Sequence, residues 1–237
     1  MPDLSQNGKL RARIRGLSQI EKHLGESLPE IIDKYRGVNF RDSQVEKSKF
    51  FAECLHLDLS GQSEELIKDR CKLSFHKDVR SSIEYGLDLV FGWLSEDLML
   101  AKIASLGIEV ELGGQDRFRE FLSAAEIGTE SDFRLTKNAS SRFLEIVFSW
   151  NGYWEMSDQW DLRDSKFKNL RQSDSLCLGI ELPSQKGFML DMKEVCNEFI
   201  ERENPAWGNK NAFTLTKMRK RLTNIPDALH TLESFFR

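Results

Sequence analysis

Hydrophobic residues recur at steps of three and four positions after Val79, which is the spacing of one face of an α-helix. The recurring positions are Ile83, Leu87, Val90, Leu94, Leu98 and Ala101. Ser81 or Ser82 supplies a suitable N-cap for this segment. The pattern therefore predicts one long amphipathic helix that ends before Gly107.

Shorter apolar segments follow, and most of them have the length of β-strands. We expect strands at 108–112, 132–135, 142–150, 175–182 and 188–192, and a returning strand at 153–156 after the turn signal Asn151-Gly152. Helices are expected at 117–125, 162–170, 192–203, 214–222 and 226–236. This order predicts an α/β fold with a mixed central sheet flanked by helices and with N- and C-terminal helical additions.

We expect the chain to form one compact domain, in which the α/β core spans residues 79–203. A helical region (1–78) precedes this core and a helical segment (204–237) follows it. The composition, 40% hydrophobic and 30% charged over 237 residues, is that of a globular protein. No apolar run reaches the roughly 18 residues of a membrane span, and the N-terminus has no signal-peptide pattern. The four widely spaced cysteines suit reduced thiols, so we expect a cytoplasmic protein without membrane contact.

The net charge of −4 does not favour nucleic-acid binding, but local basic clusters matter more than the sum. One cluster, Lys9 to Arg15, lies near the N-terminus. The others contribute the candidate nucleic-acid contacts Lys168, Arg171, Lys217, Arg219, Lys220 and Arg221. The alternative is that each cluster is a solvated helix face.

Glu145 is the one charge inside the apolar segment 143–148, and burying a lone carboxylate is costly unless it finds a cation, a metal or hydrogen-bond donors. Asp132 begins the preceding predicted strand, 13 positions earlier. Adjacent strands can bring both carboxylates to one place, where their repulsion has to be neutralised. A divalent cation such as Mg²⁺ does this directly, since it prefers hard oxygen ligands.

With these residues, segment 81–192 resembles the PD-(D/E)XK nuclease superfamily, which includes many type II restriction enzymes. The resemblance implies that Asp132 and Glu145 are catalytic metal ligands and that Glu84, in the long helix, assists them. Val147 stands where the family has its catalytic lysine. One interpretation is that the lysine has moved, with Lys166 as the catalytic candidate, Lys168 beside it and Lys137 as a weaker choice.

The resemblance implies a Mg²⁺-dependent endonuclease, a type II restriction enzyme that cuts double-stranded DNA as a homodimer. Val147 also allows a second interpretation, a non-catalytic nucleic-acid-binding or assembly module with a nuclease-like fold. A third is a helical interaction protein in which Asp132 and Glu145 are structural. In that case Glu145 pairs with an arginine such as Arg134 or Arg142.

Overall fold

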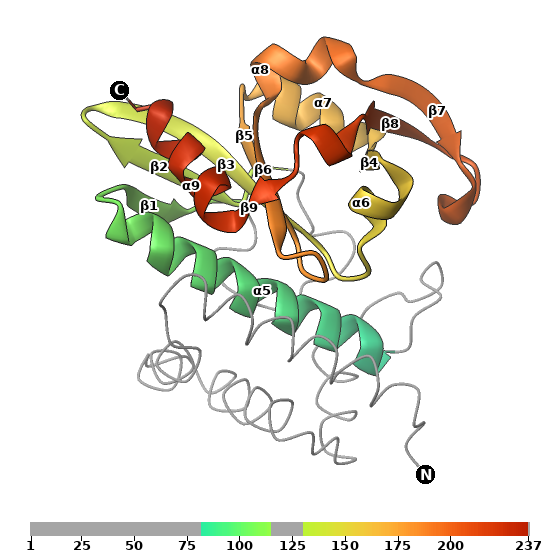
Figure 1. Cartoon of the computed structure of the whole chain (residues 1–237), viewed down its shortest axis with the longest axis horizontal. Coiled ribbons are helices and arrows are strands. Elements are labelled where there is room, and N and C mark those ends of the chain that lie inside the picture. The colour runs from blue at the N-terminus through green and yellow to red at the C-terminus, as the bar shows by residue number, and fades with distance from the viewer. Residues whose placement is uncertain (1–81, 115–129, 237) are drawn as a thin grey trace. The chain divides into compact units, whose positions relative to one another are not determined.

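The computed structural model describes residues 82–114 and 130–236 (Figure 1). The predicted helices at 1–78 and 117–125 lie outside these residues. Residues 102–114 and 130–236 form one compact unit, and residues 82–101 belong to another. None of the helices described is long and apolar enough to cross a membrane.

Helix α5 spans Ser82–Ser105 and confirms the long helix predicted from the spacing of hydrophobic residues. It ends as expected before Gly107, whose backbone φ of +71° lies in the left-handed region that favours glycine. The amide of Gly107 donates to the carbonyl of Ala104 and so closes the last turn. The chain can then reverse directly into the first strand.

A six-stranded mixed sheet forms the centre of the larger unit (Figure 1). Its order is β1-β2-β3-β5-β6-β9, and only β3 and β5 pair in parallel. The strands are β1 Glu109–Leu112, β2 Phe133–Lys137, β3 Ser140–Ser149, β5 Leu176–Glu181, β6 Lys186–Asp191 and β9 Thr223–Asn224. The prediction of a mixed central sheet with flanking helices is confirmed, and the first five of these strands lie close to their expected ranges, whereas β9 was not predicted.

The connection from β3 to β5 corrects the predicted hairpin. Residues 153–156 were expected to return as a strand, but helix α6 spans Tyr153–Ser157. Because β3 and β5 are parallel, the chain has to cross over between them and cannot turn straight back. Gly152, at φ +72°, starts α6, and the crossover continues through strand β4 (Gln159–Arg163) and helix α7 (Asp164–Gln172).

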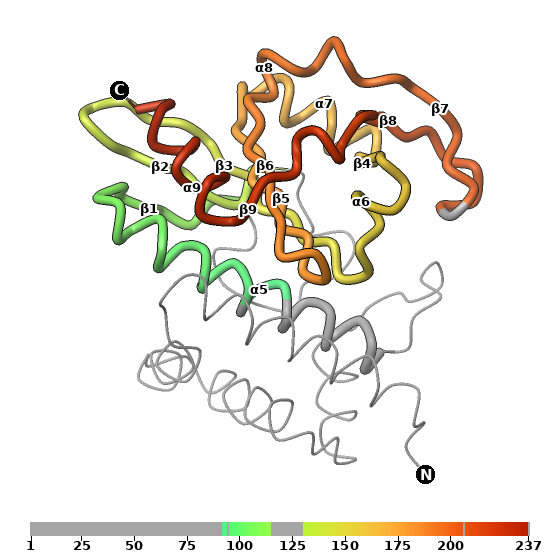
Figure 2. Tube along the Cα trace, in the orientation of Figure 1, coloured from blue at the N-terminus to red at the C-terminus, as the bar shows by residue number. Residues whose placement is uncertain are grey.

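A second sheet, of order β4-β8-β7, replaces two predicted helices. The helix expected at 192–203 is limited to α8 (Met192–Val195) and the 3₁₀ turn η3 (Cys196–Glu198), after which β7 spans Ile200–Asn204. After the 3₁₀ turn η4 (Pro205–Trp207) comes β8 (Lys210–Thr216), where the helix 214–222 was predicted to begin. Figure 2 traces this excursion away from the central sheet.

The 3₁₀ turn η5 (Met218–Lys220) takes the place of the expected basic helix around Lys217–Arg221, and Lys217 precedes it at φ +62°. Only the last predicted helix of the C-terminal segment is present, as α9 (Ile225–Ser234). Its N-cap Asn224 accepts a hydrogen bond from the amide of Asp227. The segment 204–237 therefore contributes a strand to the second sheet as well as a helix.

The two faces of the central sheet have different covers. On one face, Cys177 of β5 and Phe188 of β6 pack in a core with Phe167 and Leu170 of α7 and with residues of the second sheet. On the other face, α9 packs on β5 and β6, and Ala228 lies near Gly187. Alternate residues of each strand therefore enter different cores. Glu145 and its partner Cys177 lie on the α7 face.

Candidate functional site

The strand register explains why two acidic residues 13 positions apart come together. Phe133 at the start of β2 lies opposite Leu144 of β3. Asp132, one residue earlier, therefore extends the ladder to the position opposite Glu145. Both side chains are buried, with Asp132 9% and Glu145 5% exposed. The structure thus brings together the two carboxylates that the sequence analysis selected.

The segment before β2 holds Asp132 in place. The carbonyl of Asp132 accepts a hydrogen bond of 2.7 Å from the amide of Gly113. A Cβ atom at Gly113 would lie 2.9 Å from the carbonyl oxygen of Ser131, so only glycine allows the two segments to approach this closely. The buried hydroxyl of Ser131 is 2.6 Å from that of Ser175, which ties the segment to the start of β5.

Lys166 of helix α7 completes the cluster. Its Nζ lies 2.7 Å from Oε2 of Glu145 and 3.9 Å from Oδ1 of Asp132. The ammonium also donates to the backbone carbonyl of Glu130 at 3.1 Å. The structure therefore places Lys166, and not Lys168 or Lys137, beside the two carboxylates.

Burial raises the pKa of Glu145 well above its ordinary value of 4.5. The charge of Asp132 raises this pKa further, and the ammonium of Lys166 opposes the rise. For Lys166, burial by itself lowers the pKa, but the charges of Glu145 and Asp132 outweigh it, so the pKa is raised from 10.5. Lys166 is therefore charged at neutral pH, and Glu145 holds a proton more tightly than an isolated glutamic acid does.

The contact between Lys166 and Glu145 involves a buried oxygen. Oε2 of Glu145 is buried, and the Lys166 ammonium lies 2.7 Å from it, so this cation already compensates its negative charge. A metal ion at this oxygen has to share it with the ammonium or displace Lys166.

Other candidates from the sequence analysis are engaged elsewhere. Lys137 donates to the carbonyl of Leu106 and pairs with Glu233. Arg142 pairs with Asp191 at 2.8 Å, and Arg134 hydrogen-bonds Ser141, so neither is the cation that pairs with Glu145. Glu84 belongs to α5, but its side chain lies outside the described residues and its role stays a prediction.

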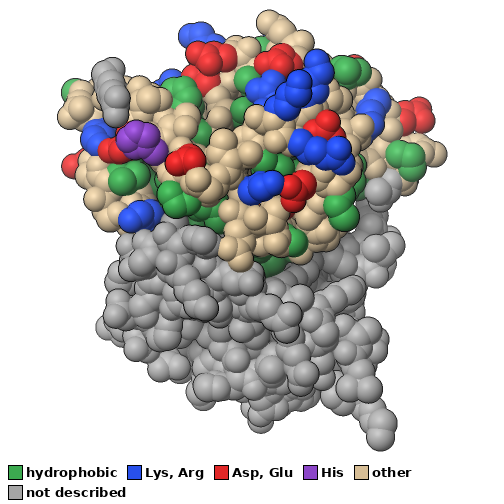
Figure 3. Space-filling model, viewed as in Figure 1, with side chains coloured by type: hydrophobic (Ala, Val, Ile, Leu, Met, Phe, Trp, Pro, Cys, Tyr) green, Lys and Arg blue, Asp and Glu red, His purple; other side chains and the backbone are tan. Residues whose placement is uncertain are grey.

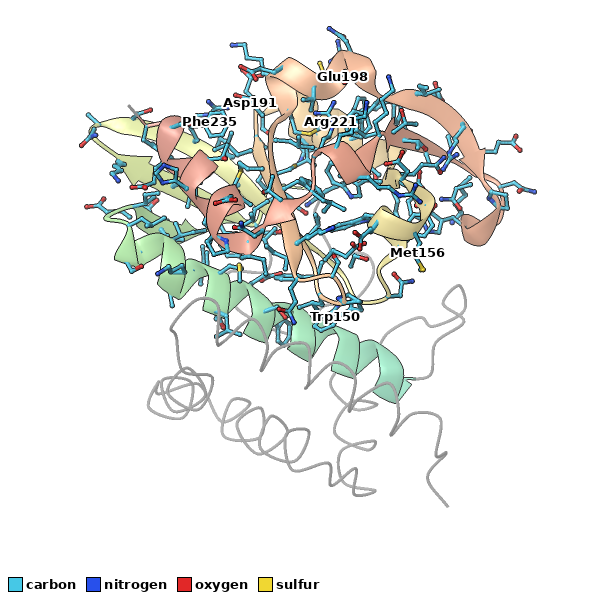
Figure 4. The ribbon with its side chains drawn as sticks, viewed as in Figure 1. Trp150, Met156, Asp191, Glu198, Arg221 and Phe235 are labelled. Carbon is cyan, nitrogen blue, oxygen red and sulfur yellow. The ribbon has the colours of Figure 1, made fainter. Side chains whose placement is uncertain are left out.

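The candidate nucleic-acid contacts separate into two groups. Lys168 and Arg171 are exposed on α7, the helix that carries Lys166. Lys217 and Lys220 are exposed near η5, but the two arginines between and after them bind other parts of the protein. Arg219 donates to backbone carbonyls of α6, and Arg221 pairs with Glu198, which Figure 4 shows beside it.

Cys177 is a neighbour of Glu145 that sequence reasoning missed. It is the parallel partner of Glu145 on β5, and no local motif signals such a pairing across a crossover. Burial raises the pKa of the Cys177 thiol well above 9.0, and the charge of Glu145 adds to the rise. The thiol is therefore neutral and contributes to the apolar wall behind the carboxylates.

We expect Cys177 to resist alkylation in the folded protein. Each unit of pKa increase reduces the reactive thiolate about tenfold, so iodoacetamide should label Cys177 more than about tenfold more slowly than the partly exposed Cys196. Peptide mapping by mass spectrometry measures both rates in one sample. In urea, where both thiols are exposed, the two labelling rates should become similar. Equal labelling rates in the native protein would contradict the buried position of Cys177 on β5.

Comparisons with known proteins add little to this geometry. No protein-family model matches the sequence, and no curated protein is similar to it. Among solved structures, the chain is similar to Hjc, a Holliday junction resolvase from the archaeal hyperthermophile Archaeoglobus fulgidus. The TM-score is 0.36 and the identity 9%, over 57% of this chain and 92% of the resolvase.

Proposed function

We propose that the protein is a Mg²⁺-dependent endonuclease that hydrolyses phosphodiester bonds of double-stranded DNA. One observation supports this most strongly: Asp132, Glu145 and Lys166 meet at one point although they come from two strands and a helix. Helix α5, the antiparallel strands β1 to β3, helix α7 and the parallel strand β5 also follow the order expected for the PD-(D/E)XK nuclease superfamily, with α6 and β4 inserted before α7.

The donor set fits a magnesium ion. Mg²⁺ is usually held by one or two carboxylates together with substrate phosphates and water. Asp132 and Glu145 supply two carboxylates, and Oε2 of Glu145 is buried 2.7 Å from the Lys166 ammonium. Within residues 82–114 and 130–236, no group of three or more His, Cys, Asp and Glu side chains is arranged to hold a metal. The site therefore needs ligands from substrate or water in addition to this pair.

When bound, the metal would polarise the phosphate and lower the pKa of a water molecule. The protein's own contribution is positional and electrostatic. The pairing of β2 with β3 holds the two carboxylates beside each other, and Lys166 would keep a positive charge near the developing negative charge of the transition state. On this proposal Lys166 takes the role of the lysine that Val147 replaces.

A type II restriction enzyme that acts as a homodimer is the more specific proposal. A dimer supplies two matched sites for the two strands of a palindrome. Lys168 and Arg171 would contact phosphates near the site, and Lys217 to Arg221 would contact phosphates further away. A neighbouring DNA methyltransferase gene would support the restriction role.

A second candidate function is a non-catalytic module that binds nucleic acid. Two observations favour it. Strand β3 contains no lysine, and Val147, at the position of the family's lysine, is partly buried against the core. Lys166 already neutralises Glu145, as it would in a structural ion pair. By contrast, acidic and basic side chains lie next to one another on the face shown in Figure 3, so this view shows no continuous basic surface for nucleic acid.

Plasmid cleavage and duplex binding, each measured with Mg²⁺ and with EDTA, separate the two functions. The proposed endonuclease cuts supercoiled plasmid only with Mg²⁺ and loses this activity in Glu145→Ala. A binding module shifts the duplex in a gel under both conditions without cutting it. If the wild-type chain neither cuts nor binds, both proposals are wrong and the acidic pair is structural.

A further inference from the structure

Part of the α7 face of the central sheet stays exposed to solvent, and it adjoins the candidate site. Phe143 of β3 is 45% exposed although it is a large apolar residue. Arg134 of β2 and Ser141 of β3 are exposed beside it. Singly exposed apolar residues are common, but this one belongs to the strand that carries Glu145. Phe143 therefore lies where a ligand of the site can contact it.

The register places Arg134 and Phe143 in the row next to the acidic pair. Arg134 lies opposite Phe143, and each is two residues from an acidic member of the site, Asp132 and Glu145 respectively. Residues two apart on a strand face the same side, at a spacing of about 6.7 Å. Arg134 and Phe143 are thus the first exposed side chains along this face from the carboxylates.

A hydrogen bond holds the Arg134 side chain in one orientation. Its Nε donates to the hydroxyl of Ser141 at 2.8 Å, and the hydroxyl of Thr136 donates to the same oxygen at 3.5 Å. In the described part of the chain, Arg134 forms no ion pair with a carboxylate, although Glu111 lies opposite it on β1. The terminal guanidinium nitrogens, Nη1 and Nη2, are therefore available to a ligand. A guanidinium held in this way matches the geometry of a phosphate group.

We infer that Arg134 and Phe143 form the binding track for the DNA strand that the site cuts. Arg134 binds a phosphate adjacent to the scissile one, and Phe143 packs against the neighbouring sugar. Glu109 and Glu111, exposed on the edge strand β1, repel phosphates and so limit the track to β2 and β3. The inference rests on the proposed endonuclease function, because its ligand is the substrate of that reaction.

Arg134→Gln tests the track, with Lys193→Gln as a control that removes the same charge from a side chain 71% exposed on α8. Steady-state cleavage of a duplex oligonucleotide gives KM and kcat, and anisotropy titrations in EDTA give the affinity at several salt concentrations. Loss of a charged hydrogen bond to phosphate should weaken binding and raise KM about tenfold, with kcat nearly unchanged. The plot of the logarithm of the association constant against the logarithm of the salt concentration has a negative slope, and its magnitude should decrease by about 0.9.

Two further variants separate a binding role from a structural one. Arg134→Lys keeps the charge and should restore the salt slope. Ser141→Ala removes the hydrogen bond that orients Arg134 together with the longer one from Thr136. It should raise KM about threefold, which corresponds to about 0.7 kcal/mol, with the melting temperature nearly unchanged. Phe143→Ala should raise KM without changing the salt slope.

If the wild-type chain cuts DNA and Arg134→Gln behaves like Lys193→Gln in KM and salt slope, the track is wrong and the proposed function stands. If the wild-type chain neither binds nor cuts DNA, the proposed function fails and the track fails with it. A tenfold higher KM and a smaller salt slope in Arg134→Gln alone support the track.

Discussion

Replacing Glu145 with glutamine is expected to lower Mg²⁺-dependent cleavage by about three orders of magnitude while the fold persists. Glutamine has nearly the same volume, but its neutral amide is a poor ligand for a hard cation. A catalytic metal contributes several kcal/mol to transition-state stabilisation, and each 1.36 kcal/mol corresponds to a factor of ten. Plasmid cleavage at saturating Mg²⁺, with circular dichroism to verify folding, measures this loss.

Glu181→Gln is the matched control for this experiment. Glu181 is also buried on the central sheet, but its carboxylate accepts hydrogen bonds from Ser149, Ser184 and the amide of Glu155. Its replacement should lower stability and leave kcat per folded molecule unchanged. Equal losses of activity in the two variants would show that Glu145 acts through the fold and not as a metal ligand.

Lys166→Met is expected to lower both activity and stability. Removing one donor that stabilises the charge of the transition state typically reduces kcat by a factor of about 10² to 10³. Removing one partner of a buried ion pair costs about 3–5 kcal/mol, because Asp132 and Glu145 then repel each other without a nearby cation. Urea unfolding measures the free energy, and Lys168→Met, on the exposed side of the same helix, should leave it nearly unchanged.

The loss of stability in Lys166→Met should depend on pH in a defined direction. In the wild type the Lys166 contribution is present below the lysine's ordinary pKa of 10.5 and is lost as pH rises through its raised folded pKa. Without Lys166, nothing opposes the rise in the pKa of Glu145, so the folded variant takes up a proton more readily. The difference between variant and wild type should shrink as pH falls from neutral towards 4.5. A difference that is constant or grows on acidification would contradict the proposed coupling.

The sequence was sufficient to predict the acidic pair because both signals were local. A charge inside an apolar strand is unusual wherever that strand lies, and Asp132 begins the preceding predicted strand. The spacing of 13 positions then becomes a direct cross-strand pairing, since the β2–β3 turn is short. The position of Lys166 was harder to predict from the sequence. It depends on how α7 packs after the crossover, and no spacing along the chain indicates that packing.

The second sheet was missed because its buried residues imitate a helix. Leu215, Met218 and Leu222 have helical spacing, and all three enter one core, but they do so from a strand, a 3₁₀ turn and the segment after it. Lys217, at φ +62°, breaks any helix between them. Hydrophobic spacing indicates which residues are buried. It indicates a helix only when all the residues between them have a helical backbone conformation.

Diffraction from crystals soaked in Mn²⁺ tests the central claim most directly, because the anomalous signal identifies the ion independently of activity. The proposed function predicts a peak between Asp132 and Glu145, about 2.1 Å from an oxygen of each carboxylate, that is absent in Glu145→Gln. If a fully soaked wild-type crystal shows no peak there, and Lys166 still contacts both carboxylates, the result would contradict the proposal of a metal-dependent endonuclease.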